Sequence, residues 1–218
     1  MKYEELERIR KEANAVLEYL YEYKSSFAEF IDSGCLRNNI NRVKREINIE
    51  SEGEGVYIRN GAFRMVIIDD ELDWVIKMNL ADVPGQHVED GCAREAKLYN
   101  YAEQKGLEEY FAACFSGGYF HSMPFTIMQK VCADTYAVIS DMDSDLRQSD
   151  KEYSEYDVYM YEEDVEVIIN VFGNYYSHKQ VFELLNFCSD VHMADFHEGN
   201  LGYNVYTNKP VILDYACC

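Results

Sequence analysis

The sequence predicts a two-lobed α+β fold, with an antiparallel sheet in the first lobe and helices in the second. Three observations lead to this prediction. Short apolar runs bounded by turn residues fill the middle of the chain, a helical periodicity interrupts them once, and helical periodicity returns in the last third. At 218 residues, of which 48% are hydrophobic, the chain can bury a core of this kind.

The N-terminal region predicts an amphipathic helix over residues 5–21 and a short helix over residues 27–31. Apolar residues recur there at helical spacing with charged residues between them: Leu6, Ile9, Ala13, Val16, Leu17 and Leu20. Gly53 and Gly55 then mark a change of periodicity. Residues 1–48 are therefore expected to form a helical extension that precedes the sheet.

Residues 49–131 predict the sheet-containing lobe. Asn60-Gly61 and Asp69-Asp70-Glu71 are typical hairpin turns between apolar runs. After Pro84-Gly85, a helix is expected over residues 91–105, ended by Gly106. The five expected strands cover residues 56–58, 63–68, 74–78, 112–115 and 125–131. The order is thus three strands, one helix and two strands.

Residues 132–218 predict a helical lobe. A helix is expected over residues 162–172, with Gly173-Asn174 as its end. A second helix has an apolar face and leads directly toward Asp195, so it would present the following loop rigidly. That face consists of Val181, Leu184, Leu185, Cys188 and Val191. The acidic, tyrosine-rich segment 141–159 predicts no particular element.

Charge and composition narrow the classes of function. Forty acidic against twenty basic residues give a net charge of −20, which argues against direct nucleic-acid binding and for either solubility or a basic partner. Most acidic residues, including Glu162 to Asp164, are expected on solvated loops and helix faces. No apolar run approaches the roughly 18 residues of a membrane span, and the start lacks a signal peptide. With seven scattered cysteines expected as reduced thiols, we predict a cytoplasmic protein without membrane association.

One motif near the C-terminus carries chemistry: Asp195-Phe196-His197-Glu198-Gly199-Asn200, followed fourteen residues later by Asp214. Asp214 ends the apolar run Val211-Ile212-Leu213. An Asp, an Asn five residues on and an Asp after a short hairpin are how phosphotransferases place a proton acceptor beside two magnesium ligands. Carboxylate and amide oxygens suit Mg²⁺, and phosphates complete its shell.

A second pair lies in the sheet-containing lobe. Lys77 closes the strand Trp74-Val75-Ile76-Lys77, and Glu95 follows eighteen residues later within the expected helix. A Lys at such a position can contact nucleotide phosphates, and an ion pair with Glu95 would hold it extended toward them. Each residue alone is usually a solvated surface residue. Their spacing favours a functional pair.

Together these motifs resemble the protein kinase-like superfamily over residues 53–216. The resemblance implies a two-lobed protein kinase-like fold: a five-stranded antiparallel N-lobe sheet with one helix, a truncated helical C-lobe and an extra N-terminal helix. Typical protein kinases have Lys where His197 stands, and the form Asp-x-His-x-x-Asn is similar to aminoglycoside phosphotransferases and UbiB-type atypical kinases. The chain ends at Cys218, so we expect no activation segment after Asp214, and we expect the helix over residues 5–21 to cover the short C-lobe.

The resemblance also implies roles in catalysis and metal binding. Asp195 would orient or deprotonate the acceptor hydroxyl, and His197 would lie near the transferred phosphate. Asn200 and Asp214 would bind Mg²⁺. His192 precedes Asp195 by three residues rather than the family's two, so it is expected to be a packed or surface histidine.

For ATP binding, the resemblance assigns Lys77 to the α- and β-phosphates and Glu95 to the ion pair that holds Lys77 toward them. Gly61 would contribute a backbone amide there, although Gly53, Gly55 and Gly61 do not reproduce the regular Gly-x-Gly-x-x-Gly loop. Gln129 and Val131 would contact adenine through their backbones. Met128 is either the bulky residue at the back of this pocket or an ordinary core residue.

Three functions remain open at this point. The first is a minimal atypical kinase, dependent on ATP and Mg²⁺, which phosphorylates a hydroxyl acceptor; a protein acceptor, chosen by basic charge, is preferred over a small molecule. The second is a pseudokinase or nucleotide-binding interaction module that acts through its acidic surface. The third is an acidic inhibitor or a nucleotidyl-transferring relative. The motif residues favour the first function, and the irregular glycine loop favours the second.

Overall fold

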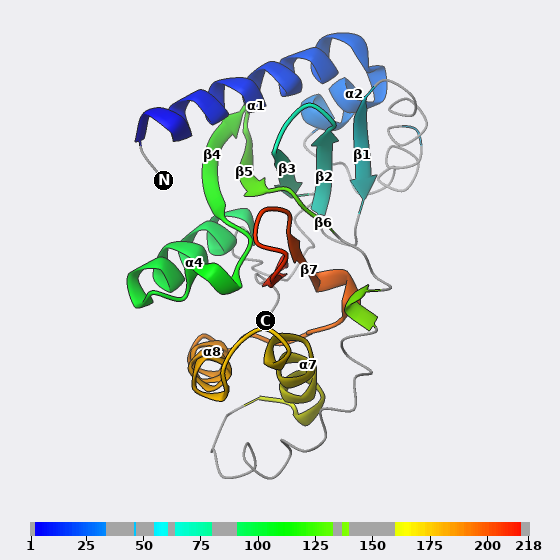
Figure 1. Ribbon diagram of the computed structural model, residues 1–218. Helices are drawn as coiled ribbons and strands as arrows, with labels where there is room; N and C mark the ends of the chain where they lie inside the picture. The colour runs from blue at the N-terminus through cyan, green and yellow to red at the C-terminus, as the bar shows by residue number, and fades with distance from the viewer. Residues whose placement is uncertain are drawn as a thin grey trace. The chain divides into compact units, whose positions relative to one another are not determined.

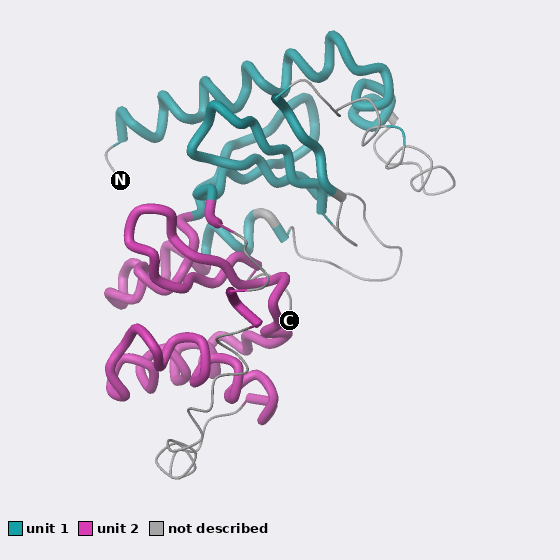
Figure 2. The backbone as a smooth tube through the Cα atoms, turned by 45° about the vertical axis from the view of Figure 1, so that its right-hand side comes forward, with its two compact units in different colours: residues 1–97, 114–130 teal, residues 98–113, 131–218 magenta. Residues whose placement is uncertain are grey.

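The computed structural model of the protein describes residues 3–33, 46, 55–60, 64–79, 91–132, 137–139 and 160–214. It is an α+β structure with two compact units (Figure 2). Unit 1 contains residues 1–97 and 114–130, and unit 2 contains residues 98–113 and 131–218. In chain order the elements are α1 (Tyr3–Tyr23), α2 (Ser25–Ser33), β1 (Val56–Asn60), β2 (Arg64–Asp69), β3 (Trp74–Asn79), α4 (Gly91–Lys105), η2 (Glu108–Tyr110), β4 (Cys114–Phe120), β5 (Met123–Gln129), β6 (Val131–Cys132), α7 (Glu162–Gly173), α8 (His178–Asp190), η3 (Glu198–Asn200), β7 (Leu201–Asn204) and β8 (Pro210–Ile212).

Unit 1 is built on a five-stranded antiparallel sheet in the order β1-β2-β3-β5-β4 (Figure 1). Ile67 pairs with Ile76, and Ile76 pairs with Ile127, so these side chains share one face. Lys77 pairs with Val66 and with Thr126 and therefore belongs to the opposite face. The prediction of a five-stranded antiparallel sheet is confirmed, and this alternation separates the core from the face that carries Lys77.

Two strand predictions need correction. β4 begins at Cys114 and runs to Phe120, further than the expected 112–115. The expected strand 125–131 is two strands, because β5 ends at Gln129 and Val131 begins β6 in a different sheet. Between them, Lys130 donates its backbone N–H to Asp73 O at 2.8 Å and its Nζ to Asp69 O at 3.0 Å. These bonds hold Lys130 against the turn that precedes β3.

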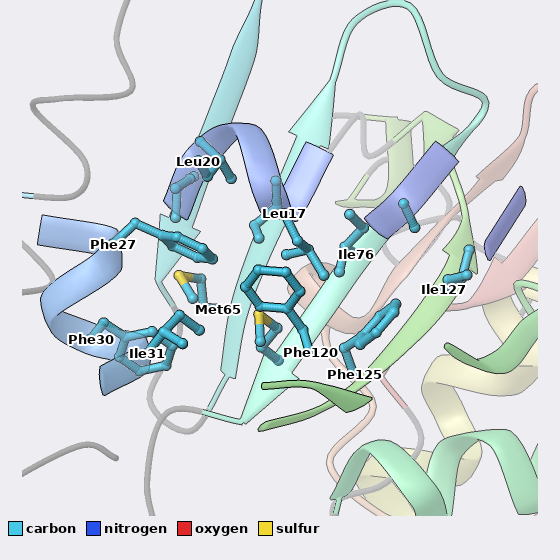
Figure 3. Packing of buried hydrophobic residues seen from close by; sticks show 14 of the residues in the cluster. Leu17, Leu20, Phe27, Phe30, Ile31, Met65, Ile76, Phe120, Phe125 and Ile127 are labelled. Atoms are coloured by element: carbon cyan, nitrogen blue, oxygen red, sulfur yellow. The ribbon is translucent and has the colours of Figure 1, made fainter. Parts of the chain in front are cut away.

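Helices α1 and α2 bury their apolar stripes against the core face of this sheet (Figure 3). The stripe of α1 follows helical spacing through Ile9, Ala13, Leu17 and Leu20, all at most 3% exposed. The guanidinium of Arg10 also donates to Ser116 O in β4. The prediction that this helix covers the C-terminal lobe was wrong, because its apolar stripe is already buried on the five-stranded sheet.

Unit 2 combines helices α7 and α8 with a three-stranded antiparallel sheet in the order β6-β7-β8. Both predicted helices are present, and Val191 is the C-terminal cap of α8 rather than part of its face. A capping box starts α8. Ser177 is the N-cap residue, and Oε1 of Gln180, three residues on, accepts a hydrogen bond from Ser177 N at 3.1 Å. This capping box fixes where α8 starts.

Within the described part of the chain, no helix has the length and apolar character needed to cross a membrane. Cys114, Cys132 and Cys188 are free thiols.

Candidate functional site

The structure brings Lys77 and Glu95 together within unit 1. Lys77 Nζ donates to Glu95 Oε1 at 2.9 Å. Ile76 and Met78 face the core, so strand alternation turns Lys77 to the other face. Glu95 lies early in α4 and is 0% exposed, while Lys77 is 7% exposed. The eighteen-residue spacing therefore identified a buried ion pair.

Arg64 is a third member of this cluster that the sequence analysis missed. Its Nη1 lies 2.5 Å from the same Glu95 Oε1, and its side chain is buried. The contact is an ion pair, although its angles are not those of a hydrogen bond. Arg64 shares a sheet face with Val66 and hence with Lys77, and this alternation is the signal that could have found it.

Two cations thus share one oxygen of a buried carboxylate. The other oxygen, Glu95 Oε2, is buried and has no hydrogen-bond partner among the residues that the structure describes. A buried charge is tolerated only where opposite charges and hydrogen bonds compensate its loss of water. Glu95 is therefore the anion that holds Lys77 and Arg64 in place on this face of the sheet.

The residues expected around adenine are divided between the two units. Gln129 is the last residue of β5, and Val131 is the first of β6 in unit 2. Met128 is 2% exposed and pairs with Val75, which places it on the Lys77 face and outside the core under α1. Gly61 lies outside the described residues, so its expected amide contact stays a prediction.

In unit 2, Asp195 occupies an uncommon backbone conformation. Its φ is +68°, in the left-handed region that residues with a Cβ rarely adopt. Asn200 Nδ2 donates to Asp195 O at 2.8 Å, and Phe196 N donates to Asp164 Oδ1 at 2.8 Å. These two bonds hold the backbone, while the Asp195 side chain is 64% exposed. The carboxylate is thus fixed at its base and accessible at its tip.

His197 is oriented by the backbone of the same loop. Its Nδ1 accepts from Gly199 N at 3.0 Å, so the neutral ring carries its proton on Nε2. Nε2 lies 3.9 Å from Asp195 Oδ2, too far for a hydrogen bond. A Cβ on Gly199 would lie 2.8 Å from His197 Cε1, so only glycine leaves room for the ring. The loop therefore presents an N–H donor beside the Asp195 carboxylate.

The β7–β8 hairpin brings Asp214 next to Asn200 along the backbone. Leu213 N donates to Asn200 O at 2.8 Å, and Asp214 is the next residue. Asn200 uses Nδ2 on Asp195 O, which leaves its Oδ1 as an oxygen ligand. One amide oxygen and one carboxylate fit Mg²⁺, provided phosphates and water complete the shell. The described residues contain no cluster of three or more His, Cys, Asp or Glu side chains that could hold a metal by itself.

Two other expectations concern residues near this loop. His192 is exposed, in agreement with the surface alternative, and its φ is +53°. Glu162 and Glu163 are exposed as expected, but Asp164 is only 7% exposed, so the prediction of a solvated acidic face was wrong for Asp164. Its partner, Phe196 N, is 32 residues away, and nothing in the local sequence distinguishes it from its acidic neighbours.

Comparison of the chain with protein-family models, with curated proteins and with solved structures found no match. The resemblance to kinases therefore depends on the residues themselves. They form two separate clusters: Arg64, Lys77 and Glu95 in unit 1, and Asp195, His197, Asn200 and Asp214 in unit 2.

Proposed function

We propose that the protein is an atypical kinase that transfers the γ-phosphate of ATP to a hydroxyl acceptor and depends on Mg²⁺. The observation that supports it most is the Asp195 loop. The exposed carboxylate of Asp195 stands on a backbone with a left-handed φ that two hydrogen bonds hold. The β7–β8 hairpin places the oxygen ligands Asn200 and Asp214 on neighbouring backbone. Strained backbone of this kind is concentrated at functional sites.

The residues of the loop account for transfer as follows. Asp195 accepts a hydrogen bond from the acceptor hydroxyl and takes its proton as the hydroxyl oxygen bonds to the γ-phosphorus. The bond from that phosphorus to the bridging oxygen breaks, and ADP leaves. His197 Nε2–H donates to an oxygen of the transferred group. Asn200 Oδ1 and Asp214 would hold Mg²⁺, which when bound would supply charge neutralisation at the phosphates.

The unit 1 cluster would serve the nucleotide. Lys77 supplies positive charge to the phosphates, and Glu95 keeps its ammonium from moving among rotamers. The order of three strands, one helix and two strands also supports the proposal. A preference for a basic protein acceptor is supported by the net charge of −20 and by an acidic depression at the start of α7, lined by Tyr161, Glu162, Glu163 and Glu166.

A second candidate is a nucleotide-binding interaction module without transfer. Glu95 Oε1 is shared by Arg64 and Lys77, so the position of Lys77 depends on a competing cation. Held in this shared ion cluster, Lys77 can contact phosphates without any transfer following. The acidic surface would then be the working part of the protein.

Transfer of label from γ-³²P-ATP tests the proposal. The wild type is incubated with Mg²⁺ and a panel of basic and neutral protein acceptors, and compared with Asp195→Ala and Asp214→Ala. We expect both variants to lose about 100-fold or more of the activity, in the range of a lost catalytic group. Asp190→Ala, an exposed aspartate at the end of α8, is the matched control and should match the wild type. Equal transfer by all the proteins, or none by any, contradicts the kinase proposal; Mg²⁺-dependent ATP binding without transfer supports the second candidate.

A further inference from the structure

Asp164 is a buried carboxylate that has no role in the chemistry proposed above. It is the third residue of α7 and is 7% exposed, whereas its neighbours Glu162 and Glu163 are exposed. Its Oδ1 accepts a hydrogen bond of 2.8 Å from the backbone N–H of Phe196, the residue that follows Asp195. A charged acceptor on a backbone N–H makes one of the stronger hydrogen bonds in proteins. The position of this carboxylate is therefore tied to the candidate catalytic loop.

The two hydrogen bonds at Asp195 act on a single peptide group. The carbonyl of Asp195 accepts from Asn200 Nδ2, and the N–H of the same peptide bond, at Phe196, donates to Asp164. Because a peptide bond is planar, partners on both of its edges fix the plane. The φ of +68° at Asp195 is disfavoured, so without such partners the residue would relax to a commoner conformation. A relaxed backbone would point the Asp195 carboxylate elsewhere.

The position of Asp164 on α7 favours an acidic side chain. It lies in the first turn of α7, where unpaired backbone N–H groups and the helix dipole stabilise an anion. It also acts on α8: burial, and then the negative charge of Asp164, raise the pKa of the Cys188 thiol well above its ordinary value. Asp164 thus lies where α7, α8 and the loop come together in unit 2.

We propose that Asp164 is a positioning residue for Asp195, since it holds the 195–196 peptide group so that the carboxylate projects to the acceptor. This inference rests on the proposed kinase function. Asp164 does not touch the reacting atoms; it sets the angle at which Asp195 leaves the backbone. Its acceptor oxygen is what matters, so an amide that keeps the oxygen should replace it and an apolar side chain of similar size should not.

The matched pair Asp164→Asn and Asp164→Leu tests this point, because both remove the charge and only one keeps the acceptor. Phosphate transfer is measured per folded molecule. We expect Asp164→Leu to lose about 10- to 100-fold in kcat with an unchanged KM for ATP, as for a misplaced catalytic group. Asp164→Asn should stay within about threefold of the wild type, since the amide oxygen still accepts. An unimpaired Asp164→Leu, or an Asp164→Asn as impaired as Asp164→Leu, overturns the proposal.

Hydrogen exchange of the Phe196 amide, followed by NMR without nucleotide, gives a readout independent of activity. The amide should exchange slowly in the wild type and in Asp164→Asn. In Asp164→Leu its exchange rate should be about tenfold higher or more. Exchange of the wild-type amide at the unprotected rate refutes the proposal even if Asp164→Leu does not fold. If the wild type transfers no phosphate but the amide results are as expected, the kinase function fails and the anchoring of the loop stands.

Discussion

Neutralising Glu95 should destabilise unit 1 more than any surface change. Its carboxylate is 0% exposed and contacts Lys77 Nζ at 2.9 Å and Arg64 Nη1 at 2.5 Å. In Glu95→Gln, two largely buried cations lose the anion that they share. Breaking a buried ion pair by removing one partner costs about 3–5 kcal/mol, a large part of the roughly 5–15 kcal/mol by which a domain is stable.

Urea denaturation followed by circular dichroism measures this loss. Glu103→Gln, an exposed position on the same helix, is the control and should change the free energy of unfolding by less than about 0.5 kcal/mol. The triple variant Arg64→Met, Lys77→Met, Glu95→Leu should recover most of the lost stability, because apolar residues can replace a buried ion cluster at little cost. A Glu95→Gln protein within about 0.5 kcal/mol of the wild type would refute the anchoring role of Glu95.

Two further outcomes are expected. Gly199→Ala should displace His197, because the new Cβ would lie 2.8 Å from His197 Cε1. Phosphate transfer should then fall about tenfold or more, as in His197→Ala. A substitution at exposed Gly106 (φ +73°) is the control and should affect stability alone. Normal activity in Gly199→Ala would exclude a role for the ring. Burial, and then Glu109, raise the pKa of Tyr110 to about 12 from 10.0. Because the pKa is raised, this contribution to stability is present below pH 10 and is lost as the pH rises toward 12. The free energy of unfolding should therefore fall between pH 10 and 12 in the wild type, and fall less in Tyr110→Phe. An equal dependence of the unfolding free energy on pH in both proteins would contradict this assignment.

The elements of the fold could be predicted where local periodicity decides them. The hairpin turns and the alternating runs located β1, β2 and β3, and Gly106, with a φ of +73°, ended α4. Which surface a helix covers depends on distant residues. The apolar stripe of α1 could pack against any apolar surface, so the sequence alone could not assign it to the five-stranded sheet.

The candidate site shows the same division. Lys77 and Glu95 could be paired because a strand and a helix at a known spacing constrain both, although β3 runs to Asn79 and Lys77 does not close it as expected. Asp164 could not be found this way, because it looks locally like a solvated charge and only tertiary packing buries it, whereas the alternation along β2 could have placed Arg64 on the face of Lys77. The strained φ of Asp195 also has no sequence signal, since aspartate adopts both ordinary and left-handed backbone.

The most direct test of the kinase proposal is the ratio of label transfer from γ-³²P-ATP by the wild type and by Asp195→Asn, with Mg²⁺ and one basic protein acceptor. The amide keeps the shape of the Asp195 side chain and removes its ability to take a proton. The proposal predicts Mg²⁺-dependent transfer by the wild type and a loss of about 100-fold or more in the variant. Transfer that is the same in both proteins, or that continues without Mg²⁺, would contradict it.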